Sequence, residues 1–543
     1  MLGGSLYQVY AIKEAVKMGH YVITCDYLPN NPGHQYAHEY YNVSTTDKEA
    51  VYELAKRLQV DGVVAYASDP AAPTAAYVCE KLGLPTSPYA SVEVLSQKDL
   101  FRRYLAEHNF NVPKYVGCSS YPEALEQIKN LTLPVMIKPV DSSGSKGINK
   151  LTNVNQLKDF IEDALSYSRE KRIIIEEFIE KDGYQISGDA FSVDGILKFH
   201  CFGNEYYSSS VAKDFAPLGE CWPFQMKPEI ITELEKDIQR LISELKMGTT
   251  AYNVEAILGK NGKLYILELG ARSGGSLIPQ ITELATGVNM VKYVIKAALG
   301  EDCSEIEMSP ARGYWSNYML HSKQTGRFKE ISFDENFAKN NLVDCVTELK
   351  SGDNVHAFRD AGDALGTLIL KYSSKEEMFS VIENMDQFVH IIIDSNMSIT
   401  IHTEPLSYTK FRGFIISSAN WFAPSLLQMP NLDEWILKMY HNGSIYYAIS
   451  GPNIISLIVG YYNREERFLY IPYVCVHPDY QGHGISQKII NYIIEHLSTD
   501  IQEILLEVRK DNNNALQAYH KMGFYETEDR DEKYLMKKEI HKS

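Results

Sequence analysis

The sequence lacks several features that would place it in other classes of protein. No apolar run in its 543 residues approaches the roughly 20 residues that a membrane-spanning helix needs, and the first residues lack the layout of a signal peptide. The eight cysteines are scattered without metal-like spacing, so we expect reduced thiols and a cytoplasmic location. Acidic residues outnumber basic ones, so the net charge is −17 and the pI is about 5.4. We therefore expect neither a nucleic-acid-binding nor a membrane protein.

What the sequence does contain is an ordinary globular composition, with 45% hydrophobic and 23% charged residues. The chain is too long for one hydrophobic core, and changes in the pattern of helices and strands divide it into four parts. We expect an α/β and α+β multidomain protein. The expected parts are a parallel α/β domain at 1–95, a central domain at 96–305 with a lid subdomain at about 134–190, a further lobe at 306–404, and a separate domain at 405–543.

Residues 1–95 alternate helical and strand-like segments, which predicts a parallel sheet flanked by helices. The segment YQVYAIKEAVKMG has helical spacing, whereas YVITCD and DGVVAYAS are predicted strands. Gly3 and Gly4 open the first helix, where a preceding strand is expected, yet only Met1 and Leu2 stand before them. The sequence leaves open whether this first strand is missing.

The stretch VMIKPVDSSGSKGI, residues 135–148, ends an apolar strand in a lysine and then turns into small residues. Backbone N–H groups of small residues can approach an anion, and Lys138 and Lys146 can neutralise its charge. For this loop alone, a solvated surface turn is at least as good an interpretation. The later segment RIIIEEFIE predicts a strand that leaves the core, where its backbone groups can contact an adenine edge.

Two acidic residues stand in otherwise apolar strands of the segment YNVEAILGKNGKLYILELG. If residues 259–262 form the turn, Glu255 lies opposite Ile266, and Glu268 falls diagonally adjacent on the same sheet face. Two carboxylates on one buried face repel each other unless a cation lies between them, and such oxygen ligands suit Mg²⁺ beside phosphates. The alternative is that one of the glutamates pairs with Arg272.

In order and spacing these segments resemble an ATP-grasp ligase, the superfamily that includes biotin carboxylase, carbamoyl phosphate synthetase and D-alanine–D-alanine ligase. The resemblance covers residues 1 to about 400 and implies a Rossmann-like domain before the ATP-grasp fold. It implies ATP and Mg²⁺ (or Mn²⁺) as cofactors, Glu255 and Glu268 as metal ligands, and Arg272 as the catalytic residue that stabilises the acyl-phosphate. The implied ATP-binding residues are Lys98 and Lys138 at the phosphates, Ser142, Ser143, Gly144, Lys146 and Gly147 in a flexible lid loop, and Glu176, Glu177, Phe178 and Ile179 at the adenine hinge.

Two positions depart from this family pattern. Gln185 stands where the family usually has a glutamate that binds the ribose, and a glutamine still accepts a hydrogen bond from a hydroxyl. Gly270 occupies the position of the usual asparagine metal ligand, and Asn253 on the adjoining strand is a candidate to compensate for it. Because the remaining set is intact, the resemblance still implies an active site, with Gln185 at the ATP.

A second constellation lies in residues 410–543. The segment FLYIPYVCVHPDYQGHGISQKII joins an alternating strand to a glycine-bearing turn and an amphipathic helix, whose first N–H groups can bind phosphate. Together with DNNNALQAYHKMGF it resembles the GNAT acetyltransferase family, which implies acetyl-CoA as cofactor and Tyr519 as the acid that protonates the CoA thiolate. The implied acetyl-CoA-binding residues are Val474, Val476, Gln481, Gly482, His483, Gly484, Ile485, Ser486 and Asn512. Candidates for a general base are His477, Tyr473 and Glu507, each with a structural role as the alternative.

The two resemblances together predict a bifunctional enzyme acting on small molecules. An ATP- and Mg-dependent ligase would activate a carboxylate as an acyl-phosphate for attack by an amine, and an acetyl-CoA-dependent N-acyltransferase would follow it in the chain. One alternative gives the first part carbamoyl phosphate- or carboxylase-type chemistry. Another makes the GNAT domain a regulatory module that senses acetyl-CoA or acetylates proteins. Whether the chain forms a homodimer is left open.

Overall fold

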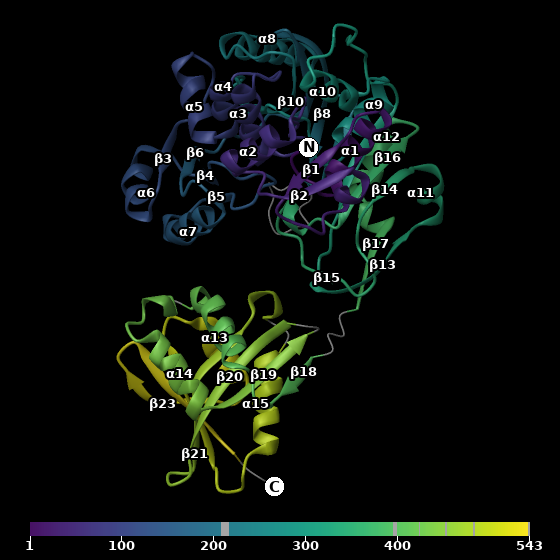
Figure 1. Ribbon diagram of the computed structural model, residues 1–543. Coiled ribbons are helices and arrows are strands. Elements are labelled where there is room, and N and C mark those ends of the chain that lie inside the picture. The colour runs from purple at the N-terminus through teal and green to yellow at the C-terminus, as the bar shows by residue number, and fades with distance from the viewer. Residues whose placement is uncertain (208–216, 395–398, 423, 451–452, 482–483, 541–543) are drawn as a thin grey trace. The chain divides into compact units, whose positions relative to one another are not determined.

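The structure is a computed structural model that describes residues 1–207, 217–394, 399–422, 424–450, 453–481 and 484–540. The chain divides into two compact units (Figure 1). The first comprises Met1–Gln324 and Phe328–Ile393, and the second comprises Thr325–Arg327 and Asp394–Ser543. Within the described residues, none of the helices has the length and apolar composition needed to cross a bilayer.

The N-terminal part of the first unit has a small parallel sheet with helices around it. Its elements are α1 (Val9–Lys17), β1 (Ile23–Asp26), β2 (Glu39–Asn42), α2 (Lys48–Leu58), the 3-10 helix η3 (Asp69–Ala71), α3 (Ala72–Leu82) and α4 (Tyr89–Ser96). Leu2 forms parallel bridges to both Cys25 and Ala65. Leu2 therefore makes the pairing expected of the first strand, and the predicted strand DGVVAYAS contributes one bridge, through Ala65, instead of a strand.

A four-stranded sheet with the order β3-β6-β4-β5 follows. Its elements are α5 (Lys98–Glu107), β3 (Tyr115–Cys118), α6 (Tyr121–Gln127), β4 (Val135–Pro139), β5 (Asn149–Leu151), α7 (Leu157–Tyr167) and β6 (Ile173–Glu177). The isoleucines at 173–175 are fully buried, because β6 has a partner on each edge and packs with Leu157 and Ile161 of α7. Figure 1 shows α6 and α7 beside this sheet.

The largest sheet of the first unit has eight strands in the order β11-β10-β7-β8-β9-β12-β16-β14. Its elements are β7 (Gln185–Val193), β8 (Ile196–Tyr206), β9 (Gly219–Trp222), α8 (Pro228–Glu244), β10 (Thr250–Leu258), β11 (Leu264–Gly270), α9 (Ile278–Thr286), α10 (Met290–Ala298), β12 (Tyr314–Leu320), β14 (Leu342–Val346) and β16 (Gly366–Tyr372). A hairpin turn at Asp194-Gly195 joins β7 to β8, and both residues have positive φ as such a tight turn requires. Apolar residues of α8 cover one face of the sheet, including Leu234, Ile238 and Leu241.

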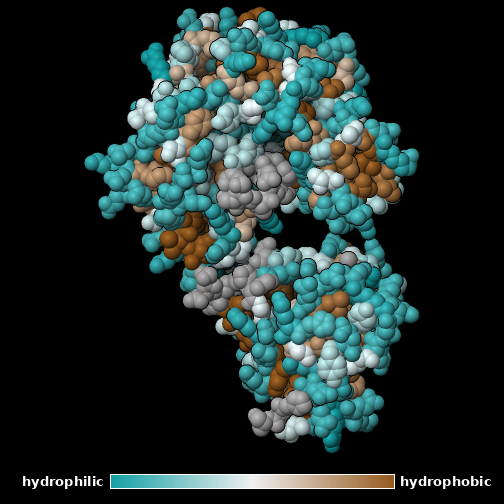
Figure 2. All heavy atoms as spheres, turned by 180° about the vertical axis from the view of Figure 1, so that it is seen from behind, coloured by the Kyte–Doolittle hydropathy of each residue, from teal (hydrophilic) through white to brown (hydrophobic). Residues whose placement is uncertain are grey.

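A three-stranded sheet, β15-β13-β17, completes the first unit. Its elements are β13 (Gly326–Phe333), α11 (Glu335–Asn340), β15 (Asn354–Val355), the 3-10 helix η6 (Ala361–Asp363), α12 (Lys375–Glu383) and β17 (Val389–Asp394). Figure 2 shows mostly polar side chains on the visible surface, with apolar ones gathered in small patches.

The second unit is built on one seven-stranded sheet in the order β18-β19-β20-β21-β22-β24-β23. Its elements are β18 (Thr400–His402), α13 (Tyr408–Ser417), α14 (Leu432–Asn442), β19 (Ser444–Ser450), β20 (Asn453–Asn463), β21 (Phe468–Val476), α15 (Ile485–His496), β22 (Glu503–Arg509), α16 (Asn513–Lys521), β23 (Tyr525–Arg530) and β24 (Lys533–Glu539). The sequence placed the last boundary at 404/405, whereas the units divide at 393/394. The difference arises because β18 pairs with β19 and so belongs to this sheet.

Candidate active site

The two glutamates singled out by the sequence lie directly opposite each other on β10 and β11. Their predicted register differs from the observed one, because Ala256 pairs with Ile266 and Glu255 pairs with Glu268. Leu267 is therefore an extra residue in β11, a β-bulge that turns Glu268 to the same face as Glu255. The expectation that both carboxylates share one face holds, but a bulge and not a regular ladder brings them together.

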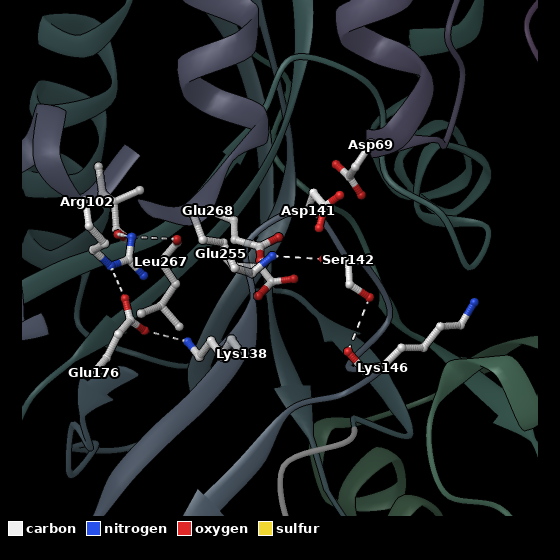
Figure 3. A network of polar contacts seen from close by, with 12 residues as sticks. Asp69, Arg102, Lys138, Asp141, Ser142, Lys146, Glu176, Glu255, Leu267 and Glu268 are labelled. Atoms are coloured by element: carbon white, nitrogen blue, oxygen red, sulfur yellow. Dashed lines mark hydrogen bonds and ion pairs between the residues drawn. The ribbon is translucent and has the colours of Figure 1, made fainter. Parts of the chain in front are cut away.

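This glutamate pair is in contact with one of the predicted phosphate-binding lysines. Lys98 Nζ lies 2.5 Å from Glu268 Oε1 and donates to the carbonyl of Ser142 at 3.0 Å. Burial, followed by repulsion from Glu268, raises the pKa of Glu255 well above its ordinary value. A divalent cation between the two carboxylates would remove that penalty, so the donor set fits Mg²⁺ with further oxygens from phosphate and water. Figure 3 shows Glu255 and Glu268 side by side.

The second lysine, Lys138 on β4, forms part of a buried ion-pair network (Figure 3). Lys138 Nζ lies 2.8 Å from one oxygen of Glu176, and Arg102 Nε lies 2.5 Å from the other. Burial acts to raise the pKa of Glu176, but Arg102 and then Lys138 outweigh it and lower the pKa to about 2. Arg102 is 1% exposed and also donates to the bulge carbonyl of Leu267 at 2.9 Å. The side chain of Glu176 therefore fixes Lys138, while adenine contacts would come from backbone groups.

Those backbone groups lie where β6 ends. The N–H of Glu177 donates to Lys114 and the N–H of Phe178 donates to Pro134, so both are already paired. The N–H of Ile179 has no partner among the described residues. An adenine edge at this hinge would therefore meet Ile179, and Glu177 and Phe178 would hold the segment in place.

The predicted lid loop, residues 142–147, is tied down by few bonds. The hydroxyl of Ser142 donates to the carbonyl of Lys146 at 3.2 Å, and the N–H of Ala361 donates to Gly144 at 3.2 Å. Gly147 has φ of +70°, and a Cβ there would lie 2.9 Å from Tyr167, so a larger residue would be strained. Ser143 is half-buried, and Lys146 extends toward Gly362 instead of the glutamate pair.

Arg272 is held by an acid that sequence reasoning did not single out. Arg272 Nε lies 2.7 Å from Asp69 Oδ1, and Nη2 lies 2.5 Å from Oδ2, so the contact is bidentate. A Cβ on Gly270 would lie 2.9 Å from Asp69 Oδ1, so Asp69 fills the space that a side chain at 270 would need. Asn253 pairs with Gly270 across the ladder, but its amide donates to Asp189 at 3.1 Å. The amide oxygen of Asn253 is the atom left for a ligand.

Further polar residues share this sheet face, which we call the acid-bearing face. It carries the side chains of Gln185, Ser187, Asp189, Glu205, Glu220, Asn253, Glu255 and Glu268. Gln185 Nε2 lies 3.5 Å from Glu255 Oε2, so it adjoins the glutamate pair. Burial raises the pKa of Asp189 to about 7. Sequence reasoning missed Asp189, Glu205 and Glu220, although each is an acidic residue in a strand of buried neighbours, which is the signal that revealed Glu255.

In the second unit, β21 and β22 pair only in part. Their parallel ladder covers Phe468–Ile471, although β21 continues to Val476. Pro472 follows the last paired residue and has no N–H to donate, which accounts for the end of the ladder. Beyond Ile471, at Val474 and Val476, the edge of β21 that faces β22 therefore has no partner strand in the described part of the unit. Such an edge offers N–H and C=O groups to an extended ligand.

The glycine turn leads from this edge into α15. Gly484 has φ of +69° and precedes the first turn, which contains Ile485 and Ser486 and has no side-chain cap. Free N–H groups at the start of a helix bind phosphate oxygens. Gln481 Nε2 donates to the carbonyl of Val476 at 3.1 Å, and Asn512 caps α16 through Ala515. The predicted residues Gly482 and His483 lie outside the described residues.

Tyr519 of α16 is buried at 9% exposure, and burial, followed by the Cys475 thiol, raises its pKa. Its phenol therefore keeps its proton at neutral pH, as a general acid must. Two of the candidate bases are engaged elsewhere. Tyr473 shares a hydrogen bond with Ser418, and burial raises its pKa. The second of these, His477, packs edge-on against aromatic rings.

The remaining candidate base, Glu507, forms ion pairs with Arg530 at 3.0 Å and Lys533 at 3.2 Å. Burial acts to raise the pKa of Glu507, but the Lys533 and Arg530 charges lower it. A carboxylate with a lowered pKa is a weak proton acceptor, so Glu507 is better explained by its ion pairs than as a base.

Family models match both parts of the chain. Residues 105–196 match the model described as D-ala D-ala ligase C-terminus, which contains an ATP-grasp segment. Residues 415–524 match the model described as Acetyltransferase (GNAT) family.

Part of the chain is also similar to known proteins. It is 25% identical over 223 residues to the carbamoyl phosphate synthase large chain of Thermoanaerobacter sp. (40% of this chain, 20% of that one). It is 23% identical over 349 residues to the C-terminal section of the same enzyme from Aquifex aeolicus (60% and 61%). The chain thus spans between a fifth and about three fifths of these relatives. The L-amino acid ligase from Bacillus licheniformis has a similar fold, with a TM-score of 0.61, 22% identity, and coverage of 73% of this chain and 98% of that one.

Proposed function

Because the chain combines an ATP-grasp fold with a GNAT domain, we propose that it is a bifunctional enzyme, an ATP-dependent carboxylate–amine ligase fused to an N-acyltransferase. The observation that carries the ligase assignment is the pair Glu255–Glu268, two half-buried carboxylates directly opposed on one sheet face with Lys98 in contact. The proposed cofactors are ATP, Mg²⁺ or Mn²⁺, and acetyl-CoA. The proposed substrates are a small carboxylate and a small amine.

In the ligase reaction, a carboxylate oxygen forms a bond to the γ-phosphorus of ATP, and the bond from that phosphorus to the bridging oxygen breaks to release ADP. The amine nitrogen then bonds to the acyl carbon, the carbon–oxygen bond to phosphate breaks, and the amine loses a proton. Lys98 and Lys138 stabilise the charge on the transferring oxygens, and Arg272 stabilises the acyl oxygen. A magnesium ion held by Glu255 and Glu268 supplies charge neutralisation at the phosphates.

The lid loop, residues 142–147, lies beside these groups through the bond from Lys98 to Ser142. Water would hydrolyse an acyl-phosphate, so exclusion of water by this loop is part of the proposed mechanism. Asp69 holds Arg272 through two contacts, and it orients the guanidinium before the substrate binds.

For the GNAT domain, the support is the unpaired edge of β21 together with the glycine turn before α15. In the proposed binding mode the edge pairs with the pantetheine arm of acetyl-CoA, and the helix N-terminus binds its pyrophosphate. The acceptor amine attacks the thioester carbonyl and loses a proton to water, the carbon–sulfur bond breaks, and Tyr519 donates its proton to the departing thiolate.

One incubation tests both activities. The full chain is mixed with ATP, Mg²⁺, acetyl-CoA and pooled small carboxylates and amines, and ADP, free CoA and new products are measured by mass spectrometry. We expect ADP release that depends on a carboxylate, and CoA release that depends on an amine. Acetyl groups found on the chain itself, with none on small molecules, would favour the regulatory alternative. No ADP release with any pool would contradict the ligase assignment.

A further inference from the structure

The acid-bearing face contains a second pair of opposed glutamates, apart from Glu255 and Glu268. Glu205 on β8 and Glu220 on β9 are direct partners in an antiparallel ladder. Like charges placed directly opposite in such a ladder destabilise it. The first pair is in contact with Lys98, whereas the described residues supply no ion-pair partner for the second.

The second pair is buried and incompletely hydrogen-bonded. Glu205 is 3% exposed and Glu220 is 8% exposed. Ser187 donates to Oε1 of Glu220 at 3.1 Å, but Oε2 of Glu220 is buried without a hydrogen-bond partner in the described part of the chain. Glu205 accepts a hydrogen bond from Tyr207, and the ammonium of Lys181 lies over the ring of Tyr207 at 4.0 Å. An unpaired carboxylate oxygen at this depth is costly unless a ligand donates to it.

The electrostatics of the pair agree with a missing cation. Burial, followed by repulsion from Glu220, raises the pKa of Glu205 to about 8. Burial raises the pKa of Glu220 to about 8 as well. Without a ligand, the pair therefore holds protons at neutral pH, and a bound cation would take their place.

We propose that Glu205 and Glu220 bind the ammonium group of the amine substrate, an inference that rests on the proposed ligase function. An ammonium has three N–H donors, which the two carboxylates and the hydroxyl of Ser187 can accept. A divalent metal fits less well here, because the phosphate oxygens that would complete its coordination lie at the first pair, three strand spacings away.

The position of the pair favours the amine over the carboxylate that becomes activated. The strand order is β11-β10-β7-β8-β9, so three strand spacings separate the middles of the two glutamate pairs. With neighbouring strands about 4.8 Å apart, this separation is roughly 14 Å. This separation is longer than the distance between a carboxylate placed at the metal-bound phosphate and an α-amino group of the same substrate molecule. An amine held at the second pair must give up its ammonium proton to one of these carboxylates and move along the acid-bearing face before its nitrogen can bond to the acyl carbon.

A binding test uses methylammonium chloride as the probe and the full chain as the protein. Hydrogen exchange of β8 and β9 is measured with methylammonium, and with tetramethylammonium and sodium at the same ionic strength. We expect methylammonium alone to slow exchange in the wild type and in the control Glu233→Gln, which changes an exposed glutamate of α8. The slowing should be absent in Glu220→Gln. No slowing by methylammonium, or equal slowing by tetramethylammonium or sodium, overturns the proposal.

A kinetic test follows once a substrate pair is known. Glu220→Gln should raise the KM for the amine about tenfold or more, as expected for a lost charge-assisted hydrogen bond. The KM for the carboxylate and for ATP should change less than twofold. Equal changes in all three KM values would mean a structural role for Glu220 and would overturn the assignment. Failure of the ligase function itself would leave the methylammonium result intact, so the two failures can be told apart.

Discussion

Replacement of Lys138 by methionine should weaken ATP binding while the first unit stays folded. Lys138 and Arg102 contact different oxygens of Glu176, at 2.8 and 2.5 Å. Because Arg102 remains after the substitution, Glu176 keeps a buried counter-ion. Methionine occupies a similar volume, so the packing around β4 is preserved.

The size of both effects follows from this network. The two cations lower the pKa of Glu176 from 4.5 to about 2, against the effect of burial. Since one pKa unit corresponds to about 1.4 kcal/mol, they stabilise the fold by about 3 kcal/mol above pH 4.5, and this contribution is lost as the pH falls toward 2. Because Arg102 still pairs with Glu176, the loss of Lys138 should remove only part of this contribution. Loss of its contact with a phosphate should weaken ATP binding by about 1.5–3 kcal/mol, or about 10- to 150-fold.

Isothermal titration with a non-hydrolysable ATP analogue measures the dissociation constant of the wild type, Lys138→Met and the control Lys158→Met. Lys158 lies on α7 near the same sheet, is exposed, and has only a surface contact with Glu162. We expect the control to match the wild type. An affinity of Lys138→Met within twofold of the wild type, with unchanged circular dichroism, would refute the assignment of Lys138 to the phosphates.

Four other outcomes are expected. Glu268→Gln should keep the fold and sharply lower ADP production; unchanged turnover across a magnesium titration would remove Glu268 from the metal site. Hydrogen exchange of residues 142–147 should slow when ATP and Mg²⁺ are added, because few bonds hold this loop, and identical exchange would make it an ordinary turn. A fragment that begins at residue 394 should bind acetyl-CoA in calorimetry more tightly than one that begins at 405, which lacks β18; equal affinities would show that β18 is dispensable. Tyr519→Phe should keep CoA affinity and slow acyl transfer about 10²- to 10⁴-fold, whereas a loss of affinity would make the tyrosine part of the pocket.

Local patterns predicted much of the fold. The strand at residues 173–177 and the helix Val9–Lys17 form as expected, because they depend on neighbours in the sequence. The pairing register of β11 could also have been predicted from a local pattern, the spacing of its apolar residues. Leu264, Ile266 and Leu269 all pack in one core, and this spacing breaks the period of two at Leu267. The predicted register of the glutamate pair was wrong because it did not include this bulge.

Long-range pairings could not be predicted in this way. From the sequence, Arg102 is predicted to be a polar residue on the exposed side of an amphipathic helix. Only the folded structure shows its contacts with Glu176 and Leu267. Asp69 meets Arg272 from the opposite end of the first unit's sequence, and no spacing rule relates them. The role of Pro472 likewise depends on which edge of β21 faces β22.

Arg102 has a mechanical consequence for the first unit. Its guanidinium contacts Glu176 in the four-stranded sheet and the carbonyl of Leu267 in the eight-stranded sheet, so one buried side chain links both sheets. We expect any rotation of one sheet against the other to be smallest near this contact. Lys138, which pairs with the same glutamate, should therefore move little. The loop at 142–147 is held by few bonds and should move more, so it can open for a nucleotide while Lys138 stays in position.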